Sequence, residues 1–562
     1  MTNHLLYLNL VSMTKLLLVL LFFASTYCEA VDPALVWVKQ FTGDYYKEGK
    51  CISLDNSGNV YTAGFFGGTV DFDPGPDTFN VTGSSYTVFL SKLNNQGEFV
   101  WVKTFAAKSI NSISIFNDTS IYLGGTDGSP NHDNSYVEKR DSSGNLKWIK
   151  RFDGVSDNFI YSISTDSGGN VYSTGCFHGL VDFDPGIDTF DLVASSSAEI
   201  FVSKLNSDGE LIWAKQMTCI SPGSGYRSYG SDIIVDKDEN ICLTGSFNGT
   251  VDFDSGQGYD TLSISSGIIN NPFVCRMDSS GNLIWAFAYY GSNYSSGNAI
   301  AVDDSNNYFI GGHFSGLIDF NTGQGIDTIR GDFSVFITKV NSFGDFQWAK
   351  AFINGLCSPA DIAIDSYGDV YTIGAFTGNV DFDPGSSTRV ISFSQNTDGF
   401  LSKLNKNGNY EWVVAFAAPN YNPVSANAIW VDDSLNVYSV GDFYNSCDFD
   451  PGTGSDSLYA TVSGFEDIFI HKMGQPILLD IDDSSAIQKA SVYPNPGRGL
   501  FQLNLIENSE IKIYNSVGQV ILEKKCFTGL NNIDICSSAS GLHIMKIKNE
   551  KGAVSYSKLI KE

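Results

Sequence analysis

The chain lacks the short motifs by which common catalytic sites are recognised. Its 562 residues contain no serine nucleophile elbow, phosphate-binding P-loop, dinucleotide fingerprint or HExxH metalloprotease motif. Histidine is scarce, with 6 residues, and the cysteines form neither a CxxC pair nor a Cys/His spacing typical of a metal site. We therefore expect no catalytic and no cofactor-binding residues of these recognisable types.

Positive charge is the second shortage. Lys and Arg number 34 against 62 Asp and Glu, which gives a net charge of −28 and a pI of about 4.4. Such a surface repels phosphate backbones, so we exclude nucleic acid as a partner. Met and Pro are also rare, whereas aromatic residues reach 13% and glycines number 56. This composition favours an all-β protein with many tight turns over a helical bundle.

Only a short apolar run marks the N-terminus. The run Leu16–Phe23 follows Lys15 and is too short to span a bilayer. Together with the Cys-Glu-Ala stretch that ends at Ala30, it predicts a signal peptide over residues 1–30, and a mature chain without a transmembrane span. Among the cysteines that remain, Cys526 and Cys536 are candidates for a disulfide between neighbouring strands.

What the chain has in abundance is repetition. Seven tryptophans recur in one motif at spacings of 47 to 72 residues, and Trp430 alone falls outside it. The seven are Trp37, Trp101, Trp148, Trp213, Trp285, Trp348 and Trp412. One full unit, from Lys50 to Phe105, holds four short runs of alternating polar and apolar residues, joined by turns such as DNSGN and NNQGE. This pattern predicts a four-stranded antiparallel meander in each unit.

The phase of the repeat predicts a closed ring. The first three runs of the meander each occur seven times, but the Trp run at residue 37 precedes any complete unit and the last unit has no Trp run. If the N-terminal strand completes the last sheet beside residues 466–473, no sheet edge is left exposed. We therefore predict a seven-bladed β-propeller over residues 31–475, closed by the N-terminal strand. Which strand is innermost stays open.

The units resemble the seven-bladed propeller repeats called SBBP. The matching elements are DxxGNVYxxGxF, DFDPG, FxxKL and GxxxWxxxF, in a fixed order over about residues 34–475. The second unit departs from the pattern, because residues 110–152 contain no DFDPG.

The acidic hexapeptide VDFDPG and its variants occur six times. Pro and Gly predict a corner after the second strand, and the preceding Phe of GxF is expected to pack between neighbouring sheets. The aspartates are expected to accept hydrogen bonds from turn amides or to face the basic residue of the third strand. The alternative is calcium, which takes hard oxygen ligands, and no other cofactor is expected. The calcium candidates are Asp71, Asp73, Asp182, Asp184, Asp252, Asp254, Asp381, Asp383, Asp448 and Asp450.

The tail is a second module. After a predicted linker over residues 476–489, about six or seven short strands predict a small Ig-like β-sandwich over residues 490–562. The tail resembles the type A C-terminal sorting domain of the type IX, or Por, secretion system, a resemblance that implies export through the periplasm to the cell surface or the medium. The residues that match the sorting signal are Tyr493, Pro494, Asn495, Pro496, Gly518, Gly541, Lys558 and Lys561.

The expected function is binding or scaffolding at the cell surface or in the medium. The repeats vary where propeller loops should lie and no catalytic set stands out, so a non-enzymatic module that recognises a protein or a glycan is favoured. Two alternatives stay open. One is a carbohydrate-active hydrolase or lyase on a propeller scaffold, and the other is a calcium-stiffened structural protein. The expected partners are the type IX secretion machinery, through the tail, and an unidentified ligand.

Overall fold

In the described part of the chain every regular element is a β-strand, as the composition predicts. The computed structural model describes residues 33–474 and 491–561, except 129–131, 196–197, 222–226, 257, 265–269, 322, 324, 393–396, 417–422, 453, 494–497, 506–507, 516–518, 539 and 550–553. The predicted signal peptide and linker lie outside these residues. None of the described residues belongs to a helix long and apolar enough to cross a membrane.

Each repeat forms a four-stranded antiparallel meander, as its four alternating runs predict. The first strands are β2 (Lys47–Leu54), β6 (Ser109–Phe116), β10 (Asn158–Thr165), β16 (Tyr229–Val235), β23 (Ser295–Val302), the second half of β26 (Phe346–Ile364) and β31 (Val424–Val431). The second strands are β3 (Val60–Asp71), β7 (Ser120–Gly128), β11 (Val171–Phe177), β17 (Ile241–Phe247), β24 (Tyr308–Asp319), β27 (Val370–Asp381) and β32 (Val437–Tyr444).

The outer half of each meander holds the basic residue and the tryptophan. The third strands are β4 (Asn80–Leu93), β8 (Asp133–Asp141), β14 (Glu199–Leu205), β20 (Asn271–Met277), β25 (Thr328–Val340), β29 (Asp398–Leu404) and β35 (Glu466–Gly474). The fourth strands are β5 (Phe99–Phe105), β9 (Leu146–Gly154), β15 (Leu211–Ser221), β21 (Leu283–Ala288), the first half of β26, β30 (Tyr410–Phe416) and β1 (Ala34–Gly43).

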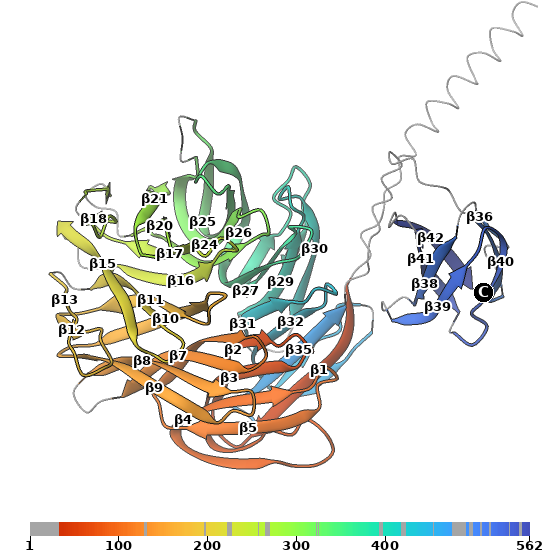
Figure 1. Ribbon diagram of the computed structural model, residues 1–562, viewed down its shortest axis with the longest axis horizontal. Helices are drawn as coiled ribbons and strands as arrows, with labels where there is room; N and C mark the ends of the chain where they lie inside the picture. The colour runs from red at the N-terminus through yellow and green to blue at the C-terminus, as the bar shows by residue number, and fades with distance from the viewer. Residues whose placement is uncertain are drawn as a thin grey trace, which may run out of the picture. The chain divides into compact units, whose positions relative to one another are not determined.

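The N-terminal strand β1 lies beside the last strand of the repeats, where the sequence predicts it (Figure 1). The two strands are antiparallel, with Trp37 opposite Lys472 and Phe41 opposite Ile468. β1 thus supplies the fourth strand of the sheet formed by β31, β32 and β35.

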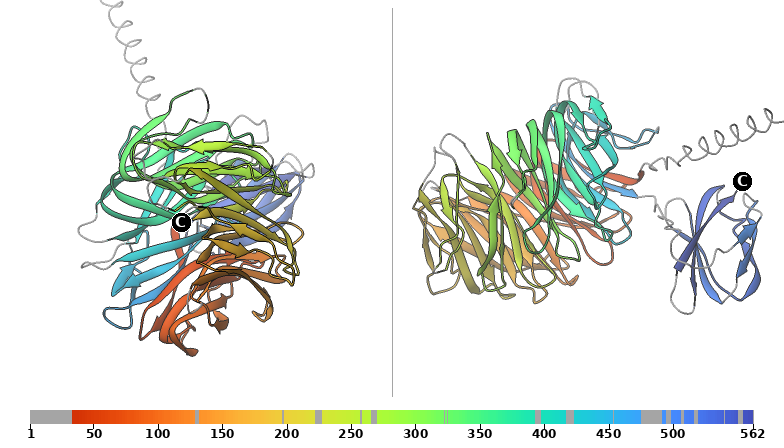
Figure 2. Two further views of the ribbon diagram at one scale, coloured as in Figure 1. Left: turned by 90° about the vertical axis from the view of Figure 1, so that its left-hand side faces the viewer. Right: turned by 90° about the horizontal axis from the view of Figure 1, so that it is seen from above.

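The first strands of the meanders contact one another in chain order. β2 contacts β6, β6 contacts β10, and the series continues through β16, β23, β26 and β31. β31 also contacts β2, so the sheet of the last repeat lies against the sheet of the first (Figure 2). These contacts make the first run of each repeat the innermost one, which the sequence left open.

Five of the six hexapeptides connect their sheet to the one before it. In five of the six copies the VDF segment pairs with the end of the preceding sheet's fourth strand or the residues just beyond it, as when Val70 lies opposite Gly43 and Val181 opposite Gly154. Short strands at these junctions are β12 (Leu180–Asp182), β13 (Asp191–Val193), β18 (Thr250–Asp252), β19 (Thr261–Ser263), β22 (Tyr290–Gly291), β28 (Val390–Ser392), β33 (Ser446–Asp448) and β34 (Ser457–Tyr459).

An aromatic cluster fills each of these junctions. In the first one Phe72 of the hexapeptide packs against Phe66 of the GxF stretch, at 5.3 Å between ring centroids, and against Phe41 of β1, at 5.1 Å. All three side chains are fully buried. The prediction that the GxF phenylalanine packs between neighbouring sheets is therefore confirmed, and the junctions are stabilised mainly by apolar burial.

The tail folds into two antiparallel sheets around a core of its own. One sheet contains β36 (Ser491–Tyr493), β37 (Leu500–Leu505) and β40 (Gly529–Asp534). The other contains β38 (Ser509–Tyr514), β39 (Val520–Cys526), β41 (Gly541–Asn549) and β42 (Val554–Lys561). Cys526 and Cys536 are both free thiols, so the disulfide considered from the sequence is not formed; Cys526 is buried and Cys536 is exposed.

Candidate functional site

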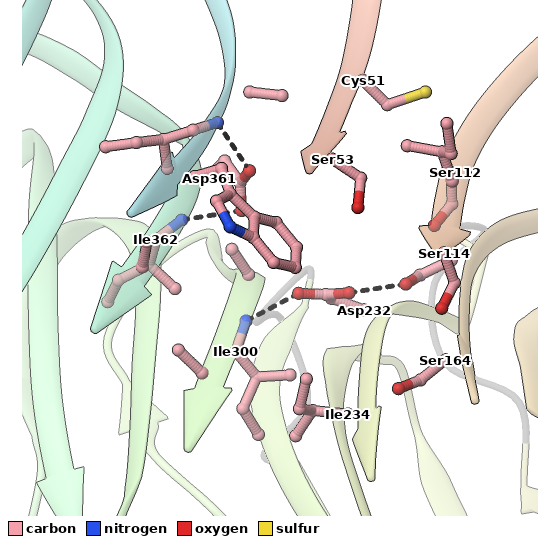
Figure 3. Close-up of a pocket in the computed structure, with 18 of the residues that line it drawn as sticks. Cys51, Ser53, Ser112, Ser114, Ser164, Asp232, Ile234, Ile300, Asp361 and Ile362 are labelled. Carbon is pink, nitrogen blue, oxygen red and sulfur yellow. Dashed lines mark hydrogen bonds between the residues drawn. The ribbon is translucent and has the colours of Figure 1, made fainter. Parts of the chain in front are cut away.

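A cavity of about 570 Å³ lies among the first strands of the repeats. All seven of these strands contribute to its wall, and Ser, Ala and Ile dominate the lining. The charged residues in the lining are Lys50, Asp232 and Asp361. Figure 3 shows the carboxyl groups of Asp232 and Asp361 with serines of other strands around them.

Register explains which side chains reach this cavity. Every first strand has a bulge at the same place, and the third residue counted from it is always Ile. All seven of these isoleucines are buried, namely Ile52, Ile113, Ile163, Ile233, Ile300, Ile362 and Ile429. Side chains alternate along a strand, so the residues before and after each Ile face the opposite way. Ser112, Asp232 and Asp361 each occupy the position directly before one of these isoleucines.

Both carboxylates accept hydrogen bonds from main-chain amides of the innermost strands. Asp232 accepts from the amides of Ile233, at 2.9 Å, and of Ile300 in the next repeat, at 2.8 Å. Asp361 accepts from Ile362, at 2.8 Å, and from Ile429 in the next repeat, at 3.0 Å. The Ser162 hydroxyl also donates to Asp232, at 2.6 Å. Each side chain therefore links two adjacent first strands that share no strand ladder.

Burial raises the pKa of both carboxyls. The pKa of Asp232 rises to about 6. The pKa of Asp361 rises to about 7, because of burial first and then the charge of Asp232. Two carboxyl groups with raised pKa values in one cavity are a feature that active sites share with structural networks.

A second set of bonds runs around the cavity at the bulge positions. Asn111 donates to the carbonyl of Ile160, at 2.6 Å, and Asn298 to that of Pro359, at 3.1 Å. Asn427 of the last repeat donates to the carbonyl of Gly49 in the first, at 2.8 Å. The contact between the last and first repeats is thus made in the same way as the internal ones.

The hexapeptide aspartates bind amides of their own loops, as the sequence predicts. Asp71 Oδ1 accepts from the amides of Asp73, at 3.1 Å, and Phe79, at 2.7 Å, and Asp73 Oδ1 accepts from Gly75, at 2.8 Å. The same three bonds recur in the other copies, from the pairs Asp182 and Asp184, Asp252 and Asp254, Asp319 and Asn321, Asp381 and Asp383, and Asp448 and Asp450.

The basic residue of the third strand has a different partner from the one considered in the sequence. Lys92 pairs with Asp55 of the DNSGN turn, at 3.2 Å, and its ammonium lies 4.6 Å from the ring centroid of Tyr61. Equivalent ion pairs join Lys204 to Asp166 and Arg276 to Asp236. Within the described residues no group of three or more His, Cys, Asp or Glu is arranged to hold a metal ion, so calcium at the hexapeptides stays a prediction.

The structure describes only part of the predicted sorting signal. Pro494, Asn495, Pro496 and Gly518 lie outside the described residues, as do the side chains of Tyr493 and Lys558. Lys561 donates to the carbonyl of Cys536, at 2.8 Å, and to that of Ser538, and so ties the end of β42 to the loop after β40. Gly541 begins β41 with a φ of 130°, a backbone angle that favours glycine.

Comparison with known proteins identifies the tail. Residues 491–562 match the family described as "Secretion system C-terminal sorting domain", which indicates export by the type IX system to the cell surface or the medium. A curated relative from Acanthamoeba polyphaga mimivirus, "Uncharacterized WD repeat-containing protein L264", is 23% identical over 74% of this chain. The chain spans only 37% of that relative's length.

The solved structures matched in the comparison share little sequence with this chain. Sqt1 from Chaetomium thermophilum is 9% identical, with a TM-score of 0.35, over 77% of this chain and 92% of its own. A protein of unknown function from Dyadobacter fermentans is also 9% identical with a TM-score of 0.35, over 78% of this chain and 98% of its own.

Proposed function

We propose that this chain is an exported binding or scaffolding module, in which a closed seven-bladed β-propeller of the SBBP type acts outside the cell and the C-terminal domain delivers it. The proposed parts are a signal peptide over residues 1–30, the propeller over 31–475, a linker over 476–489 and the sorting domain over 490–562. The route runs through the periplasm, and the ligand is a protein or a glycan. The observation that carries the export proposal is the sorting-domain match over residues 491–562.

Ring closure is supported by bonds between the first and last repeats that copy the internal ones. The Trp37 indole donates to the carbonyl of Asn95 in the first repeat, at 3.4 Å, as Trp213 does to Ser279 in the following repeat, at 3.2 Å. The Asn427 bond to Gly49 and the pairing of β1 with β35 point the same way. A closed ring leaves no sheet edge exposed at this junction.

Deletion of residues 491–562 tests the export proposal. We expect the full-length chain at the cell surface or in the medium, and the deleted chain in the periplasm with its N-terminus cleaved after Ala30. Mass spectrometry of the N-terminal peptide and immunoblots of the cell fractions measure both. Unchanged surface delivery of the deleted chain contradicts a sorting role for the tail, and an intact N-terminus contradicts the signal peptide.

A carbohydrate-active hydrolase or lyase is the second candidate. The pair of carboxyls in the cavity, Asp232 and Asp361, favours it, since such enzymes use two carboxyl groups, one of which keeps its proton through a raised pKa. Their bonds to four main-chain amides favour the binding module instead, because these acceptors are already engaged. Release of reducing ends from a polysaccharide by the wild type, lost in Asp361→Asn, would establish the enzyme.

The third candidate is a structural protein stiffened by calcium at the hexapeptides. Because Oδ1 of Asp71 already accepts two loop amides, we expect the midpoint of thermal unfolding to be the same with calcium and with excess EGTA. A midpoint that rises with calcium concentration and returns on chelation would support the structural role.

A further inference from the structure

Five aromatic side chains gather where the first and last repeats meet. We call them the aromatic platform, and they are Tyr45, Tyr46, Phe65, Tyr86 and Phe465. The ring of Tyr45 lies 4.8 Å from Tyr46 and 5.0 Å from Phe465, measured between centroids. Tyr86 lies 5.3 Å from Tyr46 and 6.0 Å from Phe65. The contacts form one connected patch drawn from both ends of the repeat region.

The platform differs from the aromatic clusters that hold the sheets together. The junction phenylalanines are fully buried, whereas Tyr45 is 44% exposed and Tyr86 59% exposed. The platform also departs from the repeated sequence pattern. At the position of Phe65 in the GxF stretch, five other repeats have Cys176, Ser246, His313, Ala375 and Asp442. Neither repetition nor burial explains why these rings are gathered here.

Charged and hydroxyl groups border the platform. The ammonium of Lys50 lies 5.8 Å from the ring centroid of Phe65 and pairs with the carboxylate of Glu48. Lys50 also lines the central cavity, so the platform adjoins the wall of that cavity. In the last repeat, Glu466 directly follows Phe465 in the chain. The side chain of Glu466 forms a hydrogen bond with Tyr444.

We propose that the aromatic platform binds an uncharged polysaccharide by stacking its pyranose rings on Tyr45 and Tyr86. The C–H face of a pyranose is apolar and fits a flat aromatic ring, while its hydroxyl groups need acceptors and donors at the edge, which Glu48, Glu466 and Lys50 supply. The proposal rests on the proposed function as a binding module and names its ligand class.

Charge selects the kind of polysaccharide. Two of the three ionic groups at the edge are carboxylates, and the whole chain has a net charge of −28. This field repels uronic acids and sulfated sugars, so neutral chains are favoured. Tyrosine and phenylalanine rings held by their neighbours lose little rotamer freedom on binding, which suits a shallow and exposed site.

Affinity electrophoresis of the full-length chain in gels that contain mannan, xylan, laminarin or alginate tests the proposal. We expect retardation by at least one neutral polysaccharide and none by alginate. Tyr45→Ala and Tyr86→Ala should each weaken the retarding interaction by about tenfold. The matched control is Tyr367→Ala, since Tyr367 is 64% exposed at the turn between β26 and β27, and it should bind as the wild type does.

The outcomes separate this inference from the proposed function. Retardation that survives both platform substitutions, or that is equally strong in alginate, overturns the platform as the site. No retardation in any neutral gel overturns the glycan ligand but leaves the exported module standing, because export is tested by deletion of the tail. Thermal unfolding of each variant shows that lost binding does not arise from lost folding.

Discussion

The first aspartate of each hexapeptide accepts hydrogen bonds from two main-chain amides. These amides lie at a corner of the chain, where no neighbouring strand pairs with them. We expect Asp71→Ala to lower the free energy of unfolding by about 1–2 kcal/mol, because the amides of Asp73 and Phe79 lose their acceptor. Asp71→Asn keeps an oxygen at this position and should lose much less. Urea denaturation measures both.

Asp77 of the same loop provides the control for this prediction. Its side chain is exposed, so Asp77→Ala should change the free energy of unfolding by no more than about 0.5 kcal/mol. If Asp77→Ala and Asp71→Ala are equally costly, the loop depends on its total charge rather than on bonds to its amides.

Asp442 lies at the junction of the last and first repeats, and we expect it to give the free energy of unfolding an unusual pH dependence. Burial, and then the charges of Glu48 and Glu466, raise the pKa of its carboxyl to about 8, while Lys50 and a hydrogen bond from Asn427 act in the opposite direction. The folded chain therefore keeps a proton that the unfolded chain has lost. The stability that this proton provides is present at low pH and disappears as the pH rises from about 4 to about 8.

Asp442→Asn should remove this contribution because the amide does not titrate. Between about pH 5 and about pH 8 the free energy of unfolding should fall less steeply in the variant than in the wild type, by up to about 1.4 kcal/mol per pH unit. Urea denaturation at several pH values measures the slopes. Two parallel profiles would show that Asp442 ionises normally in the folded chain.

At the residue scale, the sequence predicted the roles of residues that recur in every copy of a motif, but it did not reveal the residues that occur in only one or two repeats. The DFDPG loops and the packing of Phe66 follow from six copies of one pattern. Asp232 and Asp361 gave no such signal, since only two of the seven first strands have Asp there, although an alignment of those strands would have found them. Tyr45 and Phe465 lie far apart in sequence, and only the folded chain brings them together.

At the scale of the strand, β1 should behave as an internal fourth strand does. The Trp37 ring packs against Gly97 in the first repeat, and the Trp213 ring packs against Gly281 in the same way. Both glycines have a positive φ, and an added Cβ would lie within 3.3 Å of the indole. Trp37→Ala and Trp213→Ala should therefore each lower the free energy of unfolding by a similar amount, about 2 kcal/mol.

Chemical denaturation of the two variants compares the strands directly. If Trp37→Ala is nearly neutral while Trp213→Ala is costly, β1 only frays against β35 and does not complete the sheet.

The sequence identified all four strand types but not their radial order. Each run alternates polar and apolar residues, and a strand near the centre of a ring gives the same period as one at its rim. The small Ser and Ala residues of the first run, which leave room for a cavity, become informative only once the inner position is known.

At the scale of the whole molecule, the proposed ring closure predicts that the two ends of the repeat region can be joined without loss of the fold. Ala34 lies opposite Gly474, so a short Gly/Ser linker can connect them in a circular permutant of residues 34–474. New ends between Ile187 and Asp188 would fall in a surface loop, where Ile187 is completely exposed. We expect this permutant to unfold cooperatively, with a thermal midpoint within about 10 °C of the parent.

A Gly/Ser insertion between Ile187 and Asp188 in the unpermuted chain is the matched control. If the insertion is tolerated and the permutant does not fold, the two ends are not neighbours in solution and the ring proposal is wrong.

Architecture and export could be predicted from the sequence because both depend on motifs that repeat or that follow a fixed order. The all-β class, the meanders, the place of β1 and the sorting domain all followed from such patterns. The ligand could not be predicted from the sequence. The exposed side chains that would recognise a ligand are the positions at which the repeats differ from one another.

The bond between Gln40 and Asp467 spans 427 residues of sequence. A ribosome that stops early, or a protease that trims either end, therefore leaves β1 or β35 without its neighbour and presents a bare strand to other chains. The pairing of β1 with β35 needs the last repeat, and we expect contacts so distant in sequence to slow folding. In the proposed closed ring, β1 and β35 pair only when both ends of the repeat region are present, so a truncated chain exposes a strand edge that the full chain covers.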